Sequence, residues 1–204
     1  MLKRILTELK EHYPFTLFGA LTGILLMMLF KNMEHETAHC LFYVFHPLHV
    51  FLSAMVTAAI YKKYINNYST GITKFLKVLV VGYVGSILIG TLSDSIIPFW
   101  GEKLLDMHAE HVHVGFVEKW WIVNPVAIIA IVIAYFHPVT KAPHAMHVLV
   151  STWASLFHMI MAIDHTSASI PYFGIFIFLF LAVWLPCCVS DIIFPMLFVK
   201  TRKY

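Results

Sequence analysis

Long apolar segments alternate with short polar or charged stretches along this chain. Each apolar segment reaches about 17 residues or more, which is enough for a helix to cross the hydrocarbon core of a bilayer. The last segment is interrupted by Pro186 and Pro195, so its ends are the least well defined. The pattern predicts an all-helical, multi-pass membrane protein with six transmembrane helices, at residues 14–30, 41–61, 75–97, 120–136, 144–163 and 171–199.

Lysine and arginine are concentrated on one side of the predicted membrane helices. If the N-terminus is cytoplasmic, that side holds every basic residue except Lys31, Lys103 and Lys119. The positive-inside rule then places both termini in the cytoplasm. Residues 1–13 are charged and roughly amphipathic, and they predict a helix on the cytoplasmic surface of the membrane.

Composition agrees with a location in the cell membrane, because 60% of the residues are hydrophobic and only 12% are charged. The formal net charge of +3 gives no indication of a nucleic-acid partner. No long linker divides the chain, so residues 1–204 are expected to form a single membrane domain. Whether that domain forms a homo-oligomer is left open by the sequence.

Histidines recur with one spacing in the two halves of the chain. Three histidines in the first half are separated by the same intervals as three in the second, and an aspartate in a later apolar segment accompanies each set. Such a repeat indicates a duplicated unit. The repeated residues are His39, His46, His49 and Asp94 in the first half, and His137, His144, His147 and Asp191 in the second.

The halves, residues 1–100 and 101–204, each contain three predicted helices. Because three is an odd number, the second half enters the membrane from the opposite side, as in the inverted-topology repeats of many transporters. This topology places the first histidine set and Asp94 toward the outer face, and the second set and Asp191 toward the inner face. His39, His46 and His49 fall on one side of a helix, within an arc of about 80°, and His144 and His147 share one side of the fifth predicted helix.

The repeated residue types favour a transition metal. Imidazole and carboxylate together suit zinc or ferrous iron, whereas magnesium and calcium prefer sites built from oxygen. Ionisable residues inside membrane helices are costly and therefore mark functional positions. The sequence predicts a protein that binds a divalent transition metal and transports it, with the metal ion and the bilayer as partners. The same groups can carry protons, so proton coupling stays open.

Further histidines lie outside the repeated sets. Several fall in the predicted outer loop 101–119, where they would collect metal or cover a site. His158, which has Ile60 as its counterpart in the first half, would join the outer site. The secondary metal candidates are His35, His108, His111, His113, His158 and His165.

Other functions remain open beside transport. His35, Glu36 and His39 form the H-E-x-x-H pattern of zinc hydrolases, in which Glu36 would activate water. A di-iron oxidoreductase is a further type of membrane metalloenzyme, although the adjacent histidine pairs of membrane hydroxylases are absent from the sequence. Histidines on facing helices would also suit a haem-binding electron-transfer protein. Transport is favoured because an enzyme has little reason to repeat its ligands in an inverted second half.

Overall fold

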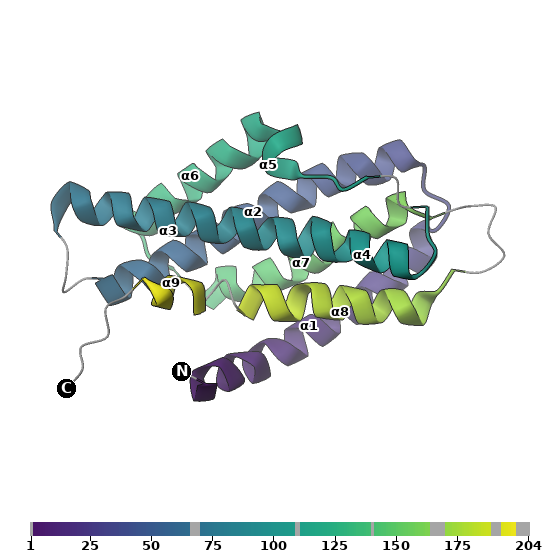
Figure 1. Ribbon diagram of the computed structural model, residues 1–204, viewed down its shortest axis with the longest axis horizontal. Coiled ribbons are helices and arrows are strands. Elements are labelled where there is room, and N and C mark those ends of the chain that lie inside the picture. Colours follow the sequence, from purple (N-terminus) through teal and green to yellow (C-terminus); the bar gives the residue numbers. More distant parts are fainter. Residues whose placement is uncertain are drawn as a thin grey trace.

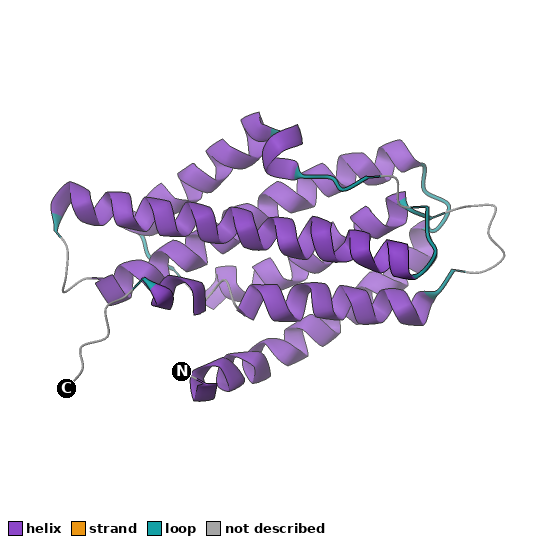
Figure 2. Ribbon diagram, viewed as in Figure 1, coloured by secondary structure: helices purple, strands orange, loops and turns teal. Residues whose placement is uncertain are grey.

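The computed structural model describes residues 2–65, 70–108, 111–139, 141–163, 170–188 and 193–198. Within these ranges every regular element is helical, and the long helices lie side by side in an elongated bundle (Figure 1 and Figure 2). The elements are α1 (Leu2–Phe30), α2 (His35–Ile65), α3 (Gly71–Thr91), a π-helical turn η1 (Leu92–Ile96), α4 (Ile97–Leu104), α5 (Gly115–Glu118), α6 (Trp120–Phe136), α7 (Lys141–Met161), α8 (Tyr172–Cys188) and α9 (Phe194–Leu197).

The predicted apolar segments correspond to α1, α2, the run from α3 to α4, α6, α7, and α8 with α9. Among the residues that the structure describes, three stretches are long and apolar enough to cross a membrane: Tyr13–Phe30, His35–Ile65 and Gly71–Leu104. Shorter apolar helices accompany them in α6, α7 and α8. The all-helical, apolar architecture is compatible with a helical membrane protein. The six crossings and the inverted repeat stay predictions.

The N-terminal residues differ from the expected separate surface helix, because α1 continues through Pro14 without a break. Trp184 of α8 donates a hydrogen bond from Nε1 to the carbonyl oxygen of Leu9, at 3.0 Å. The ring of Tyr13 meets the same tryptophan edge to face. These contacts attach the first turns of α1 to the bundle.

The third predicted helix also extends further than expected. The helical run that begins at Gly71 continues to Leu104 instead of ending at residue 97, and η1 interrupts its regular hydrogen bonding. Ser93, Asp94 and Ser95 lie in this turn, and all three side chains are buried. A π turn inside a helix is frequently found at a functional site.

The central helix of the bundle is α2, which packs against α3, α6 and α7. Gly82 of α3 shows how closely these helices approach. A Cβ added at Gly82 would lie 3.0 Å from Ile131 of α6 and 3.2 Å from Ala58 of α2. Small residues at such crossings are typical of helix packing in membranes. The face of α2 that meets α3 and α7 carries the buried histidines.

Candidate metal centre

The Asp94 carboxylate is the centre of a buried polar cluster. Its Oδ2 atom lies 2.9 Å from Nδ1 of His46 and 2.7 Å from Nδ1 of His49. These histidines are three residues apart on α2, so both imidazoles lie on one side of the helix. When Asp94 is ionised it can only accept hydrogen bonds, so each Nδ1 donates and each Nε2 keeps its lone pair.

The second carboxylate oxygen, Oδ1, accepts hydrogen bonds from two hydroxyl groups. Ser93 donates at 2.7 Å from the same turn, and Ser151 donates at 2.8 Å from α7. Ser155, one turn further along α7, donates to the backbone carbonyl of Ser93 at 2.9 Å. Asp94 therefore accepts four side-chain hydrogen bonds, which is about the capacity of a carboxylate.

The two histidine sets meet beside this carboxylate. The ring of His147 on α7 stacks on the ring of His49, with centroids 5.9 Å apart and planes inclined by 11°. Cys187 of α8 places its Sγ atom 4.0 Å from His49 Nε2. The buried group formed by His46, His49, Asp94, His147 and Ser151 is called the central cluster below.

This arrangement differs from the expectation of separate sets near opposite membrane faces. His49 lies midway along α2, because the helix begins at His35 and not at residue 41. His147 lies against it, so members of both sets share one location. His137 is exposed at the end of α6 and does not join them. The side chains of His144, His165 and Asp191 lie outside the described residues.

His46 is enclosed by close packing. Phe42 stacks on its ring with centroids 5.2 Å apart, and Gly115, the first residue of α5, lies against the Cδ2 and Nε2 atoms of the ring. A Cβ added at Gly115 would come within 2.4 Å of both Cδ2 and Nε2 of His46. The Nε2 atom is buried and has no hydrogen-bond partner among the described residues.

A second group of potential ligands lies near the start of α2. His39, His113 and Glu118 each present a ligand atom, and these atoms lie within 4.8 Å of one another. Nδ1 of His113 is 3.1 Å from the Glu118 carboxylate, which also accepts hydrogen bonds from the Tyr43 hydroxyl and the Val114 amide. His39, His113 and Glu118 are called the outer cluster.

Burial affects the pKa values of His113 and Glu118 in different ways. Desolvation lowers the pKa of His113 below its ordinary value, although the neighbouring Glu118 carboxylate opposes this shift. Desolvation alone would raise the pKa of Glu118, but hydrogen bonds from Tyr43 and His113 outweigh it and hold that pKa below its ordinary value. A neutral imidazole beside an ionised carboxylate is the form in which both bind a metal.

A cavity of about 260 Å³ lies beside the outer cluster and is called the histidine pocket. At its wall Nδ1 of His158 lies 2.7 Å from the carboxylate of Glu102, and both side chains are buried. Nε2 of His158 is buried without a hydrogen-bond partner in the described part of the chain. The pocket is lined by His35, Glu102, His108, His111, His113, His158, Met161 and Ala162.

Phe42 lies between the histidine pocket and the central cluster. Its ring contacts His158 at a centroid distance of 5.5 Å and His113 at 6.2 Å, and it stacks on His46. A short row of side chains thus connects the pocket, through Phe42, to His46 and the Asp94 carboxylate.

The zinc-hydrolase pattern is placed at the exposed start of α2. The rings of His35 and His39 stack with centroids 6.3 Å apart, and Glu36 is exposed. His35 lines the histidine pocket, whereas His39 belongs to the outer cluster.

Several residues of these clusters were not singled out by the sequence. Nothing in the sequence spacing of Glu102 and Glu118 associates them with His158 and His113. Gly115 and Phe42 carry no chemical signal in sequence, since their importance arises from what packs beside them. The proximity of Cys187 to His49 depends on how α8 lies against α2, which no local sequence pattern indicates.

Comparison with known proteins gives no match to a family model, a curated protein or a solved structure, so the proposals below rest on the residues and their geometry.

Proposed function

We propose that this protein binds a divalent transition metal, of the zinc or iron type, and moves it through the helical bundle as part of transport across a membrane. The outer cluster receives the ion, and the central cluster holds it inside the bundle.

The observation that carries the proposal is the pairing of His46 and His49 with a single oxygen of Asp94. Histidines that bind metals commonly donate their other ring N–H to a carboxylate, which fixes the tautomer and turns the free nitrogen toward the ion. Asp94 already accepts four hydrogen bonds, so its role in this proposal is to position the imidazoles. At His49 the metal ligand is then the Nε2 atom, whereas Gly115 packs against the Nε2 atom of His46.

The ligand types around His49 favour a borderline metal. Its Nε2 atom has the Cys187 sulfur 4.0 Å away, and the imidazole of His147 lies alongside. Nitrogen and sulfur ligands together are typical of zinc sites, whereas magnesium and calcium sites are built from oxygen. Zinc is therefore the first ion to test, and ferrous iron is the second.

The position of the histidine pocket supports transfer between the two clusters. His113 belongs to the outer cluster and also lines the pocket, and it lies 5.6 Å from His158 between ring centroids. Phe42 separates these rings from His46. Movement of this single aromatic ring would connect the pocket with the central cluster, which suits stepwise passage between imidazoles.

The proposal is tested by elemental analysis of purified protein and by metal uptake into proteoliposomes. Wild-type protein should retain zinc or iron and take it up. His49→Ala should lower both the retained metal and the uptake, because it removes the imidazole that contacts both Asp94 and His147. His137→Ala should leave both unchanged, because His137 is exposed at the end of α6.

The two variants distinguish a shared central site from two separate sites. Equal losses in His49→Ala and His137→Ala would favour separate sites at opposite faces and contradict a shared centre. Wild-type proteoliposomes without zinc or iron uptake, under either a proton or a metal gradient, would exclude transport. Protein that also retains no metal after reconstitution would exclude the binding function.

A zinc hydrolase is the second candidate, and one observation favours it. His39, His113 and Glu118 can hold an ion within about one helical turn of Glu36, the residue that would activate water. This candidate predicts turnover of a peptide substrate that Glu36→Gln abolishes while zinc stays bound. Metal-loaded protein with no turnover would exclude it.

A further inference from the structure

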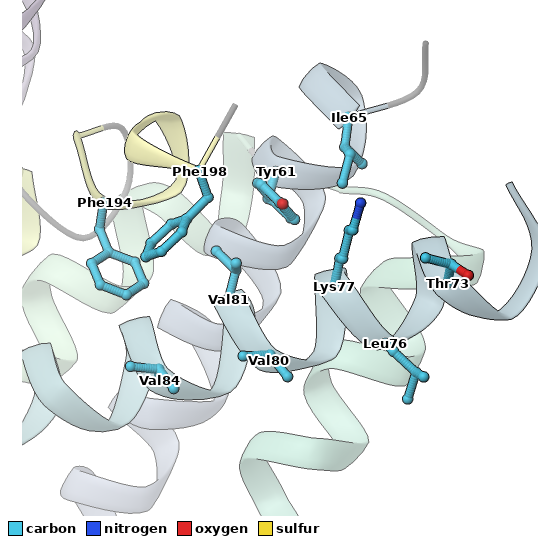
Figure 3. A pocket seen from close by; sticks show the side chains of 10 residues that line it. All are labelled: Tyr61, Ile65, Thr73, Leu76, Lys77, Val80, Val81, Val84, Phe194 and Phe198. Atoms are coloured by element: carbon cyan, nitrogen blue, oxygen red, sulfur yellow. The ribbon is translucent and has the colours of Figure 1, made fainter. Parts of the chain in front are cut away.

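A large groove lies at the end of the bundle opposite the histidine pocket. It has a volume of about 860 Å³ and lies between the last turns of α2, the first half of α3, and α9 (Figure 3). This volume falls within the range of sites that bind small molecules. The groove is lined by Tyr61, Ile65, Thr73, Leu76, Lys77, Val80, Val81, Val84, Phe194 and Phe198.

The lining combines a long apolar floor with polar groups at one end. Leu76, Val80 and Val84 follow one side of α3, and they are 50%, 58% and 43% exposed. In Figure 3 the Lys77 side chain extends from α3 toward Ile65 at the end of α2. Lys77 is the only charged residue among the described residues that line the groove.

The wall opposite α3 is held in place by close packing. Phe194 of α9 lies against Gly85 of α3, where an added Cβ would come within 2.9 Å of the phenylalanine ring and 3.1 Å of Thr57. Phe198, one turn further along, continues the aromatic wall of the groove (Figure 3). The groove is therefore formed by specific contacts between α2, α3 and α9.

The charge at this end of the bundle is positive. Lys62 and Lys63 lie in the last turns of α2, and Lys74 and Lys77 lie in the first turns of α3. Lys62 donates to the carbonyl oxygen of Tyr135 and lies over its ring, so this lysine is engaged by α6. Lys77 lines the groove with its side chain (Figure 3). This is the end that the basic residues assign to the cytoplasm.

We propose that the groove binds one anionic phospholipid of the cytoplasmic leaflet. One of its two acyl chains lies along Leu76, Val80 and Val84 against the aromatic wall, and its phosphate pairs with the ammonium group of Lys77. Basic pockets between helices on the cytoplasmic side are a common setting for anionic lipid headgroups. The site needs only residence in a membrane, so it stands independently of metal binding.

The test compares two lipids on purified protein in detergent. Dioleoyl phosphatidylglycerol and dioleoyl phosphatidylcholine are titrated separately, and bound lipid is counted by native mass spectrometry. Wild-type protein should bind phosphatidylglycerol in preference. Lys77→Gln should weaken that binding about fivefold, as expected for the loss of one lysine near a headgroup. Val80→Trp should reduce binding of both lipids, because the larger ring fills the exposed floor of the groove.

Lys63→Gln is the matched control, because Lys63 is exposed at the same end of α2 but does not line the groove. Equal weakening in Lys63→Gln and Lys77→Gln would reduce the effect to general surface charge and overturn the assigned site. Equal affinity of wild-type protein for both lipids would overturn it as well. A change of oligomeric state in Val80→Trp with unchanged lipid binding would assign the groove to a second copy of the chain.

Discussion

Four side-chain donors converge on the carboxylate of Asp94. Replacing this buried carboxylate should therefore cost more stability than replacing an exposed one. Asp94→Asn leaves one carbonyl oxygen to accept from two imidazoles and two hydroxyls, so buried donors lose their partners. We expect a loss of about 2–4 kcal/mol in stability together with reduced metal content. Thermal unfolding in detergent and elemental analysis measure the two effects.

Asp106→Asn provides the control for this substitution. Asp106 is exposed at the end of α4 and has a φ of 52°, a backbone conformation that asparagine also tolerates. Stability should therefore change by less than about 0.5 kcal/mol. An Asp94→Asn protein as stable and metal-rich as Asp106→Asn would contradict the central role of the carboxylate.

The outer cluster should respond to pH through His113. Burial lowers the pKa of this imidazole below its usual value of about 6.5, so it is neutral at pH 7 and stays neutral on mild acidification. Protons compete with metal only when the pH approaches the lowered pKa, and binding is then lost as the pH falls. The pKa of Glu118 is also lowered, so its carboxylate stays ionised through this range.

Zinc titration by calorimetry at several pH values checks this expectation. Affinity at the outer cluster should change little between about pH 7 and pH 6.5 and should decline below that range. His113→Ala should weaken binding and remove the contribution of this imidazole, leaving that of His39. A steep loss of affinity already above pH 7 would contradict a neutral, desolvated His113.

The short helix α5 contacts both clusters, because Gly115 lies against His46 and Glu118 belongs to the outer cluster. Its first residue, Gly115, lies against His46 so closely that no side chain fits. Gly115→Ala should displace either the imidazole or the short helix that carries Glu118. We expect lower thermal stability and weaker zinc binding at the outer cluster, measured by unfolding and by calorimetry.

Gly71→Ala separates this steric effect from the general effect of replacing glycine. Gly71 has a φ of +57° and nothing within 4 Å of an added Cβ, so the substitution strains only the backbone. It should lower stability by about 1 kcal/mol and leave zinc affinity unchanged. Unaltered zinc affinity in Gly115→Ala would show that α5 tolerates the displacement.

At the level of elements, hydrophobic patterning predicted helix positions well and helix lengths poorly. The apolar window ended at residue 97, but Gly101 and Glu102 are buried against neighbouring helices and extend the helix to Leu104. The polar start of α2, from His35 to His39, likewise lies outside any apolar window. Because these helices are longer than predicted, His49 and Asp94 lie deeper in the bundle than their positions in the apolar segments indicated.

The histidine pattern identified histidines that the structure places close together, but it did not predict how they combine. His46, His49 and His147 were identified from spacing alone, and all three are buried beside Asp94 or each other. His137 satisfied the same spacing but is exposed. Spacing within one helix defines a common face, whereas contacts between helices depend on tertiary packing that no local pattern contains.

For the whole molecule, the direction of each helix determines which loops lie at which end of the bundle. Labelling of those loops therefore tests which end faces the cytoplasm. In Figure 1, α1, α3 and α7 run toward one end of the bundle, while α2, α6 and α8 run toward the other. The predicted orientation places Lys63 in the cytoplasm and Lys103 outside. In intact cells, a membrane-impermeant maleimide should label Lys103→Cys, and it should label Lys63→Cys only after permeabilisation, with the native cysteines replaced by serine. The reverse labelling would invert the orientation.

A π turn holds one residue more than a regular α-helical turn. This extra residue in η1 sets the direction in which the side chains of α4 point around the helix axis. Each residue advances a helix by about 100°, so deleting Ser95 would restore regular α-helical winding and rotate Glu102 away from His158 by that angle. The histidine pocket would lose the carboxylate that pairs with His158, although no residue of the pocket had been changed. One inserted residue beside Asp94 thus keeps two separate carboxylates, about two turns apart, in register with two different helices.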